Sequence, residues 1–285
     1  MKKIIYLIYI LIATPIANAQ FLGDGTETNP YQIRNKTELE YLADSVNSSA
    51  PSPADNWSKD KYFILINDIT APVTQKIGTT ISISFQGNFD GNNKTIRLDM
   101  NYPGESYVGL FGSVDRGTIK NVIIRNTSNV RGNYYVGGIC GYACKYSAIS
   151  NCINNGEVQG NYYVGGICGE INSGTTISNS INNAKVKGNE GVGGISGFIF
   201  ESTIANCMNV ESIEGNNIVA GIGGFVYGIL TSSTIINCSN YGYIKGIVGT
   251  AAGIIGYDND YSAITNSINT GVVEGGGGTG GILGE

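Results

Sequence analysis

The stretch Val136-Gly-Gly-Ile-Cys-Gly141 recurs as Val164-Gly-Gly-Ile-Cys-Gly169 and again as Val192-Gly-Gly-Ile-Ser-Gly197. Looser copies occupy residues 219–224, 251–256 and 279–284, and a shorter copy, Val108-Gly-Leu-Phe-Gly112, precedes them all. Successive copies begin about 28 residues apart, and a fixed period of this length is typical of a solenoid, in which each repeat forms one coil. The motif therefore predicts about six near-identical coils.

Two further markers run in step with this motif. One is Ile-x-Asn, with its asparagines at Asn121, Asn151, Asn179, Asn206, Asn237 and Asn266. The other is Val/Ile-x-Gly, which begins at Val130, Val158, Val186, Ile213, Ile244 and Val273. The repeats lack helical periodicity, whereas Glu157-Val158-Gln159 alternates polar and apolar residues as a strand does. One strand per marker predicts an all-β fold, a three-sided parallel β-helix with three short strands per coil.

The recurring asparagine has a structural interpretation. Asparagine tolerates the left-handed backbone conformation and can hydrogen-bond to its copy one coil away. A turn at this residue would let the preceding isoleucine and the following small residue, such as Ile149 and Cys152, both point inward. We therefore interpret the six asparagines as a structural ladder along one corner of the solenoid.

The N-terminal part of the chain differs from the repeats. Lys2 and Lys3, an apolar run and a small-residue cleavage pattern predict a secretory signal peptide over residues 1–19. Residues 20–60 read as a cap with an amphipathic helix, whose apolar face is Leu39, Leu42, Ala43 and Val46 and whose Thr37 and Glu40 have capping-box spacing. Residues 61–107 read as the first coils, and residues 108–285 as the repeat solenoid. The repeats stop at Glu285 part way through a coil, so we expect the solenoid to be truncated there.

Composition excludes several classes of function. The formal charge is −5, which disfavours a nucleic-acid partner, because phosphate recognition needs a basic surface. After the signal peptide, we expect no membrane-spanning segment. Without histidine or a CxxC pair, we expect no metal site and no cofactor. Secreted cysteines suggest disulfides first, but most of the six occupy repeat positions that other small residues fill elsewhere, so we expect buried, unpaired thiols: Cys140, Cys144, Cys152, Cys168, Cys207 and Cys238.

The Gly-Gly-Ile-x-Gly, Ile-x-Asn-Cys and Val-x-Gly elements resemble the GLUG-motif repeats of bacterial surface proteins. The opening Gly25-Thr-Glu-Thr-Asn-Pro-Tyr31 and the segment Phe85-Gln-Gly-Asn-Phe-Asp-Gly91 resemble the lead-in of the same proteins. The resemblance implies an exported β-helix of adhesin type, secreted or held on the outer cell surface. Similar repeats precede the peptidase domain of some immunoglobulin A metalloproteases, but this chain has no histidine for a His-Glu-x-x-His site.

Two classes of function follow. The first is a non-enzymatic adhesion, binding or stalk module that presents a long face to glycans or to proteins of a host or cell surface. The alternative is an enzyme acting on polysaccharides, a lyase or glycosidase, or the non-catalytic repeat region of a larger secreted protease. An enzyme would need clustered carboxylates. The acidic candidates are Asp68, Asp90, Glu170, Asp258 and Asp260, and we assign none of them as catalytic.

One surface feature suggests a ligand. Tyr134-Tyr135 and Tyr162-Tyr163 are the same dipeptide one coil apart. Because side chains alternate along a strand, we expect one tyrosine of each pair to face outward and to stack on its copy at about 4.8 Å. Such a strip either only stabilises the sheet or contributes to ligand binding.

Overall fold

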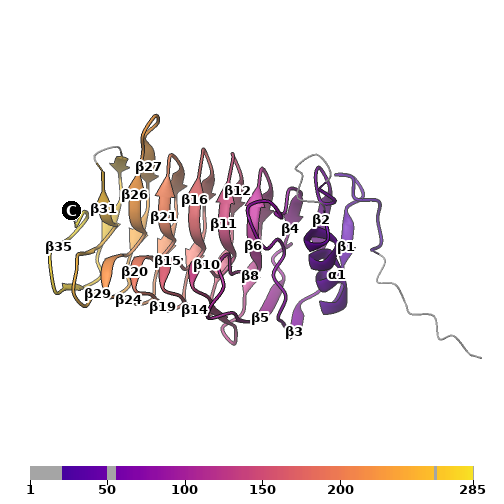
Figure 1. Ribbon diagram of the computed structural model, residues 1–285, viewed down its shortest axis with the longest axis horizontal. Coiled ribbons are helices and arrows are strands. Elements are labelled where there is room, and N and C mark those ends of the chain that lie inside the picture. Colours follow the sequence, from indigo (N-terminus) through magenta and orange to yellow (C-terminus); the bar gives the residue numbers. More distant parts are fainter. Residues whose placement is uncertain (1–20, 50–55, 260–261, 285) are drawn as a thin grey trace, which may run out of the picture.

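The computed structural model describes residues 21–49, 56–259 and 262–284. They form a single parallel β-solenoid, whose coils follow one another along the long axis of the molecule (Figure 1). All pairs of named strands are parallel, and equivalent residues of successive repeats are in register, for example Val136 with Val164 and Ile149 with Ile177. The sequence-based prediction of an all-β parallel β-helix is thus confirmed.

The strands fall into four sheets, each running along the solenoid. The nine-stranded sheet contains, in order, β1 (Tyr31–Ile33), β2 (Tyr62–Leu65), β4 (Asn88–Asp90), β7 (Thr118–Lys120), β12 (Ala148–Ser150), β17 (Thr176–Ser178), β22 (Thr203–Ala205), β27 (Ser233–Ile236) and β32 (Ser262–Thr265). One six-stranded sheet contains β10 (Tyr134–Gly137), β15 (Tyr162–Gly165), β20 (Glu190–Gly193), β25 (Asn217–Ala220), β30 (Ala251–Ala252) and β35 (Thr279–Gly280).

The second six-stranded sheet contains β6 (Phe111–Asp115), β11 (Cys140–Cys144), β16 (Cys168–Asn172), β21 (Ser196–Phe200), β26 (Gly223–Tyr227) and β31 (Ile255–Asp258). The 14-stranded sheet joins two ladders through β5 (Thr95–Asn101), which also pairs with β3 (Ile69–Val73). Its first ladder is β8 (Ile123–Ile124), β13 (Ile153–Asn154), β18 (Ile181–Asn182), β23 (Met208–Asn209), β28 (Ser239–Asn240) and β33 (Ile268–Asn269). Its second is β9 (Asn129–Arg131), β14 (Glu157–Gln159), β19 (Val186–Lys187), β24 (Ile213–Gly215), β29 (Ile244–Gly246) and β34 (Val273–Gly275).

The repeats from Tyr134 to Gly275 each contain five short strands, where the three markers predicted three. In the repeat that starts at Tyr134 these are β10 to β14. The Gly-Gly-Ile motif lies at a corner and therefore contributes to two strands, β10 and β11. Asn151 separates β12 from β13, because its left-handed backbone turns the chain. Sequence markers identify corners as well as strands, and three markers therefore undercount the strands.

The six asparagines of the Ile-x-Asn marker all adopt the left-handed conformation, with φ between 49° and 55°. Ile149 before the turn and Cys152 after it are both fully buried. Side-chain contacts along this column are sparse: within the described ranges, the amide of Asn237 donates to Asn206 at 3.0 Å, and that of Asn121 to Asp90 at 2.9 Å. The backbone turn, rather than a continuous chain of amide bonds, is what this column shares.

A continuous amide ladder does exist, and it lies inside the solenoid, three residues further along each coil. It consists of Asn154, Asn182, Asn209, Asn240 and Asn269, of which the first four are fully buried. Each Nδ2 donates to the Oδ1 of the next member, at 3.0, 2.9, 2.8 and 2.7 Å in turn. Each Nδ2 also donates to a backbone carbonyl two residues ahead, as Asn182 does to Ala184 at 2.8 Å. A buried amide normally needs such partners, and here the partners are its own copies.

The second glycine of the Gly-Gly-Ile motif makes room for this ladder. A Cβ atom built on Gly166 would lie 2.3 Å from Cγ of Asn182, and one on Gly194 would lie 2.6 Å from Cγ of Asn209. Any larger residue there would collide with the amides. Two of the recurring sequence elements, Gly-Gly and the inner asparagine, therefore form one packing unit.

The helix α1 (Lys36–Asn47) lies at the N-terminal end of the solenoid (Figure 1), with Leu39, Leu42, Ala43 and Val46 buried as predicted. Its capping box is shifted from the predicted position. Asn35, rather than Thr37, is the N-cap and accepts a hydrogen bond from the backbone N–H of Glu38 at 3.0 Å. Glu38, the third helical residue, in turn accepts from the backbone N–H of Arg34. Asparagine caps a helix as well as threonine does, so spacing alone could not decide between the two.

Removing one rung of the inner ladder should destabilise the fold. Asn182→Ala removes one cross-coil hydrogen bond from each of the buried amides of Asn154 and Asn209, and we expect it to lower the free energy of unfolding by about 2–5 kcal/mol. The matched control is Asn183→Ala at the adjacent exposed position, expected to change stability by about 0.5 kcal/mol or less. Urea unfolding followed by circular dichroism measures both. Equal losses of stability in the two variants would show that a buried amide of the ladder contributes no more to the fold than an exposed one.

The six cysteines are all buried and unpaired, as the repeat register predicted. Burial raises the pKa of the Cys152 thiol to about 12 and that of Cys238 to about 11. We therefore expect iodoacetamide to label Cys152, Cys207 and Cys238 only after unfolding, because the reactive thiolate is both scarce and inaccessible in the native state. Mass spectrometry of native and unfolded samples measures this, and a disulfide-linked peptide pair would contradict it.

Candidate functional site

The most regular aromatic feature of the outer surface is the pair Tyr134 and Tyr162, at the starts of the paired strands β10 and β15. Their ring centroids lie 4.5 Å apart, and the ring planes are inclined by 13°. Tyr134 is exposed and Tyr162 is half-buried. Parallel register places the two side chains above one another, so the stack follows directly from the repeat.

Tyr134 and Tyr162 stack as expected, but the second tyrosine of each pair is also partly exposed, which alternation along a strand did not predict. Tyr135 and Tyr163 are half-buried and have φ values of 56° and 52°. A left-handed residue interrupts the alternation of a strand, and it therefore sends a second consecutive side chain outward. Tyr107, with φ of 59°, begins the same column, and the three rings stack at 5.1 and 5.6 Å.

A shallow groove of about 330 Å³ begins at Gln159 and Asn161, just before Tyr162 in the sequence, and extends over the following coils. It is lined mainly by amides and backbone: Gln159 and Asn161 on one coil, then Asn189 and Asn216 on the next two, with glycines between them. Asn161 donates to Asn133 at 2.8 Å, and Asn216 donates to Asn189 at 2.5 Å. Lys187 and Glu214 in the lining form an ion pair at 3.2 Å. The groove therefore offers many neutral hydrogen-bonding groups, and its first coil is the one that carries Tyr162.

A second aromatic column lies on the six-stranded sheet from β6 to β31, and the tyrosine dipeptides alone did not reveal it. Its members follow the last glycine of each motif: Ser113, Tyr142, Glu170, Phe198, Phe225 and Tyr257. The two columns touch, since Tyr135 packs on Tyr142 at 5.8 Å and Tyr163 on Phe198 at 5.0 Å. Aligning the repeats would have shown this column, because the residue after the final glycine is aromatic in most copies.

Glu170 is the charged member of that column, and it is only 7% exposed. Burial raises the pKa of its carboxyl to about 7, and the hydrogen bond from Asn172 only partly opposes this effect. In the unfolded chain the pKa returns to its ordinary value near 4.3. The folded state therefore holds a proton that the unfolded state has lost between these two values. Stability is fully present below about pH 4 and falls as the pH rises through 7.

Glu170→Gln should remove this pH dependence. Relative to the wild type, we expect the free energy of unfolding of the variant to rise by about 3 kcal/mol between pH 4 and pH 8, because the buried carboxylate no longer has to ionise. Urea unfolding at both pH values measures the difference. Glu157→Gln, at an exposed position of β14, controls for the loss of one negative charge. A difference that stays constant with pH would refute the assignment.

The other acidic candidates do not gather into a catalytic cluster. Asp68 accepts the backbone N–H of Thr95 at 2.7 Å, and this bond lowers its pKa. Asp90 accepts from the backbone of Asn92 and pairs with Lys120 at 3.4 Å. Asp258, at the end of β31, accepts the hydroxyl of Ser262. Glu170 and Asp258 are separated by β21 and β26, and Asp260 lies outside the described residues. None of the described hydrogen bonds joins two of these carboxyls.

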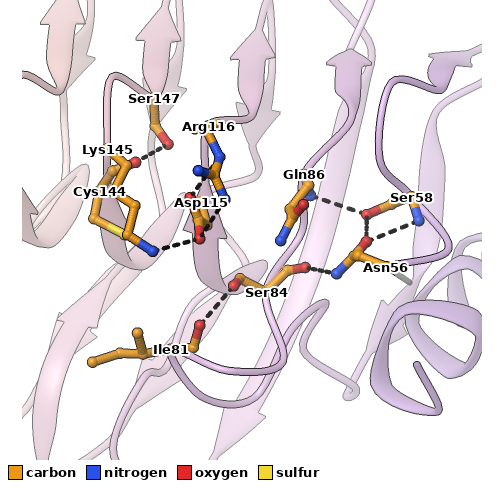
Figure 2. A network of polar contacts seen from close by, with 10 residues as sticks. All are labelled: Asn56, Ser58, Ile81, Ser84, Gln86, Asp115, Arg116, Cys144, Lys145 and Ser147. Atoms are coloured by element: carbon orange, nitrogen blue, oxygen red, sulfur yellow. Dashed lines mark hydrogen bonds and ion pairs between the residues drawn. The ribbon is translucent and has the colours of Figure 1, made fainter. Parts of the chain in front are cut away.

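Polar groups are also concentrated near the first coils, where Figure 2 shows Asp115 between Arg116 and Lys145. The carboxylate of Asp115 is almost fully buried, and it pairs with Lys145 at 2.9 Å and with Arg116 at 3.3 Å. In the same region Asn56 donates to the backbone of Ser84 at 2.6 Å, and Ser58 accepts from the backbone N–H of Gln86 at 3.0 Å. These contacts tie coil to coil, which is a structural role.

No group of three or more potential metal ligands occurs in the part of the chain that the structure describes. Among the same residues, no helix has the length and apolar character needed to cross a bilayer. The predicted signal peptide at residues 1–19 lies outside the described ranges.

Comparisons with known proteins agree on the fold. No family model matches the chain. A solved structure from Bacteroides ovatus, described as a "putative immunoglobulin A1 protease", superposes with a TM-score of 0.76 over 92% of this chain and 86% of its own, at 23% identity. Halomucin from Haloquadratum walsbyi is 33% identical over 131 residues, which is 43% of this chain and 1% of halomucin. At this identity the structural likeness shows the fold alone, and the chain spans a small part of halomucin.

Proposed function

We propose that this chain is an exported, non-enzymatic binding module that holds a glycan against one face of its solenoid. The observation that carries the proposal is the Tyr134–Tyr162 stack at the surface, together with the amide-lined groove that begins at Asn161 on the same coil as Tyr162. Stacked tyrosines present apolar surface with polar tips, and carbohydrates offer the same combination of C–H faces and hydroxyls. The amides along the groove can donate and accept hydrogen bonds without the desolvation cost of a charge.

Sequence features support an extracellular setting. They are the signal-peptide pattern at residues 1–19 and the resemblance of the repeats to GLUG-motif surface proteins. A solenoid presents the same groups again on each coil, and this suits a long repetitive ligand better than a small molecule. A protein of a host or cell surface is the alternative ligand, because tyrosine-rich surfaces also favour protein contacts.

The enzyme alternative receives less support from the same groove. Glycoside hydrolysis ordinarily uses two carboxyl groups on either side of the bond. The lining of the groove contains one, Glu214, and Lys187 neutralises it. The name of the Bacteroides ovatus protein does not transfer a protease activity, since this chain contains no histidine for a metalloprotease motif. We therefore place this chain among non-catalytic modules, either alone or as the repeat region of a larger protein.

A glycan array tests the proposal. We expect the wild type to bind at least one class of extracellular polysaccharide, and Tyr134→Ala/Tyr162→Ala to bind it about tenfold more weakly, because both stacking surfaces are lost. Tyr135 and Tyr163 stay unchanged, since they pack against the neighbouring sheet. Tyr241→Ala, at an exposed tyrosine outside the strip, is the matched control. If the wild type binds and the double variant binds equally well, the strip is only structural.

A further inference from the structure

The aromatic column on the sheet from β6 to β31 contains one residue that does not belong to an apolar surface. Glu170 on β16 lies in register with Tyr142 on one neighbouring strand and with Phe198 on the other. Its side chain occupies the place of a ring and is almost as buried as the core. A carboxylate in such surroundings is costly unless a cation or several hydrogen bonds compensate for its charge.

Only one of the two carboxylate oxygens of Glu170 accepts a hydrogen bond from the described residues. Oε1 accepts the side-chain N–H of Asn172 at 2.9 Å. No hydrogen bond from the described residues reaches Oε2, and none of the ion pairs in the described ranges includes Glu170. Asp115, a comparably buried carboxylate in the same sheet, has two cations. The structure therefore leaves one oxygen of Glu170 available to a partner that the chain itself does not provide.

Aromatic residues flank the side chain of Glu170. Tyr135 and Tyr163, on the neighbouring sheet, contact the flanking Tyr142 and Phe198 edge to face. The charge of Glu170 acts on several hydroxyls at once: after burial, it is the next cause of the raised pKa of Tyr107, Tyr135, Tyr142 and Tyr163. Four tyrosine hydroxyls thus lie within electrostatic range of one carboxylate.

These groups have complementary attractions for one kind of ligand. The face of an aromatic ring attracts a cation, and the attraction grows when water is excluded. A carboxylate adds a full negative charge and one free acceptor. A guanidinium group would seek both oxygens of the carboxylate, but Asn172 already occupies Oε1. A hard metal ion would need more oxygen ligands than this site offers.

We propose that Glu170, with the rings of Tyr135, Tyr142, Tyr163 and Phe198, forms a binding site for a primary alkylammonium group. The ammonium donates one N–H to Oε2 of Glu170, and its methylene groups lie against the rings. Two kinds of ligand carry this group, a lysine side chain and an amino sugar. The site does not depend on the proposed glycan strip, because neither Tyr134 nor Tyr162 contributes to it.

Titrations of the full chain, followed by NMR of tyrosine ring signals, test the site. At about pH 8.5, where Glu170 is ionised and an alkylamine is still protonated, n-butylammonium should shift the rings of Tyr135 and Tyr163. We expect n-butanol, its neutral counterpart, to bind about tenfold more weakly. Glucosamine against glucose repeats the comparison for the amino-sugar source at about pH 7, because the ammonium of an amino sugar, like an α-amino group, loses its proton near pH 8. Whichever ammonium compound binds more tightly identifies the source, and equal binding by charged and neutral members in both comparisons overturns the proposal.

Three variants separate the possible causes. Glu170→Gln keeps the size of the side chain and should lose about tenfold in affinity for the ammonium probe. Tyr163→Leu keeps an apolar side chain but removes one ring, and it should weaken binding while Glu170 remains. Tyr134→Ala/Tyr162→Ala should bind the ammonium probe as the wild type does, even if it no longer binds glycan. Circular dichroism confirms folding of each variant, and unchanged affinity in a folded Glu170→Gln variant refutes the site.

Discussion

The register of the coils depends on the amide ladder in the interior of the solenoid. Apolar stacks such as Ile149 on Ile177 drive burial, but they are non-directional and would tolerate a small slip. The inner asparagines would not, because each needs an oxygen of the next coil at hydrogen-bond distance. A slip of one residue would break the cross-coil hydrogen bonds of several buried amides, at a cost of about 1–3 kcal/mol each. The ladder therefore selects one alignment of the coils, which the apolar contacts of the core alone would not do.

Once the interior sets the alignment, the outward residues can differ from coil to coil without changing the register. The residue after the last glycine of the motif is Tyr142 in one coil, Glu170 in the next and Phe198 in the one after. Because the coils are in register, any outward residue lies directly beside its counterpart one coil away. A single substitution therefore changes part of a continuous surface. The tyrosine stack, the amide groove and the carboxylate among the rings are three results of this principle. A regular scaffold of this kind can acquire a site by changing few residues.

Much of the fold could be predicted from one sequence, because the length of the sequence repeat is also the length of one coil. The period predicted the number of coils. The three markers predicted the fold class and, through the repeat positions of the cysteines, the buried thiols. The predictions failed where a backbone turn broke a simple rule. Alternation could not anticipate the left-handed Tyr135 and Tyr163, and counting markers missed two strands per coil. The inner ladder was visible as a second asparagine three residues after the first, but only the structure shows that it is buried. The pairing of Glu170 with rings depends on contacts between sheets, which no single repeat contains.

Hydrogen exchange of the asparagine side chains tests the central claim most directly, because it reports on the amides themselves. In NMR spectra recorded after transfer into D₂O, the side-chain N–H signals of Asn182 and Asn209 should persist, since both are fully buried and bonded. Those of Asn151 and Asn179, at the exposed outer corner, should disappear at once. Equally rapid loss of all four would contradict the account, since it would mean that the inner amides face water and that something else sets the register.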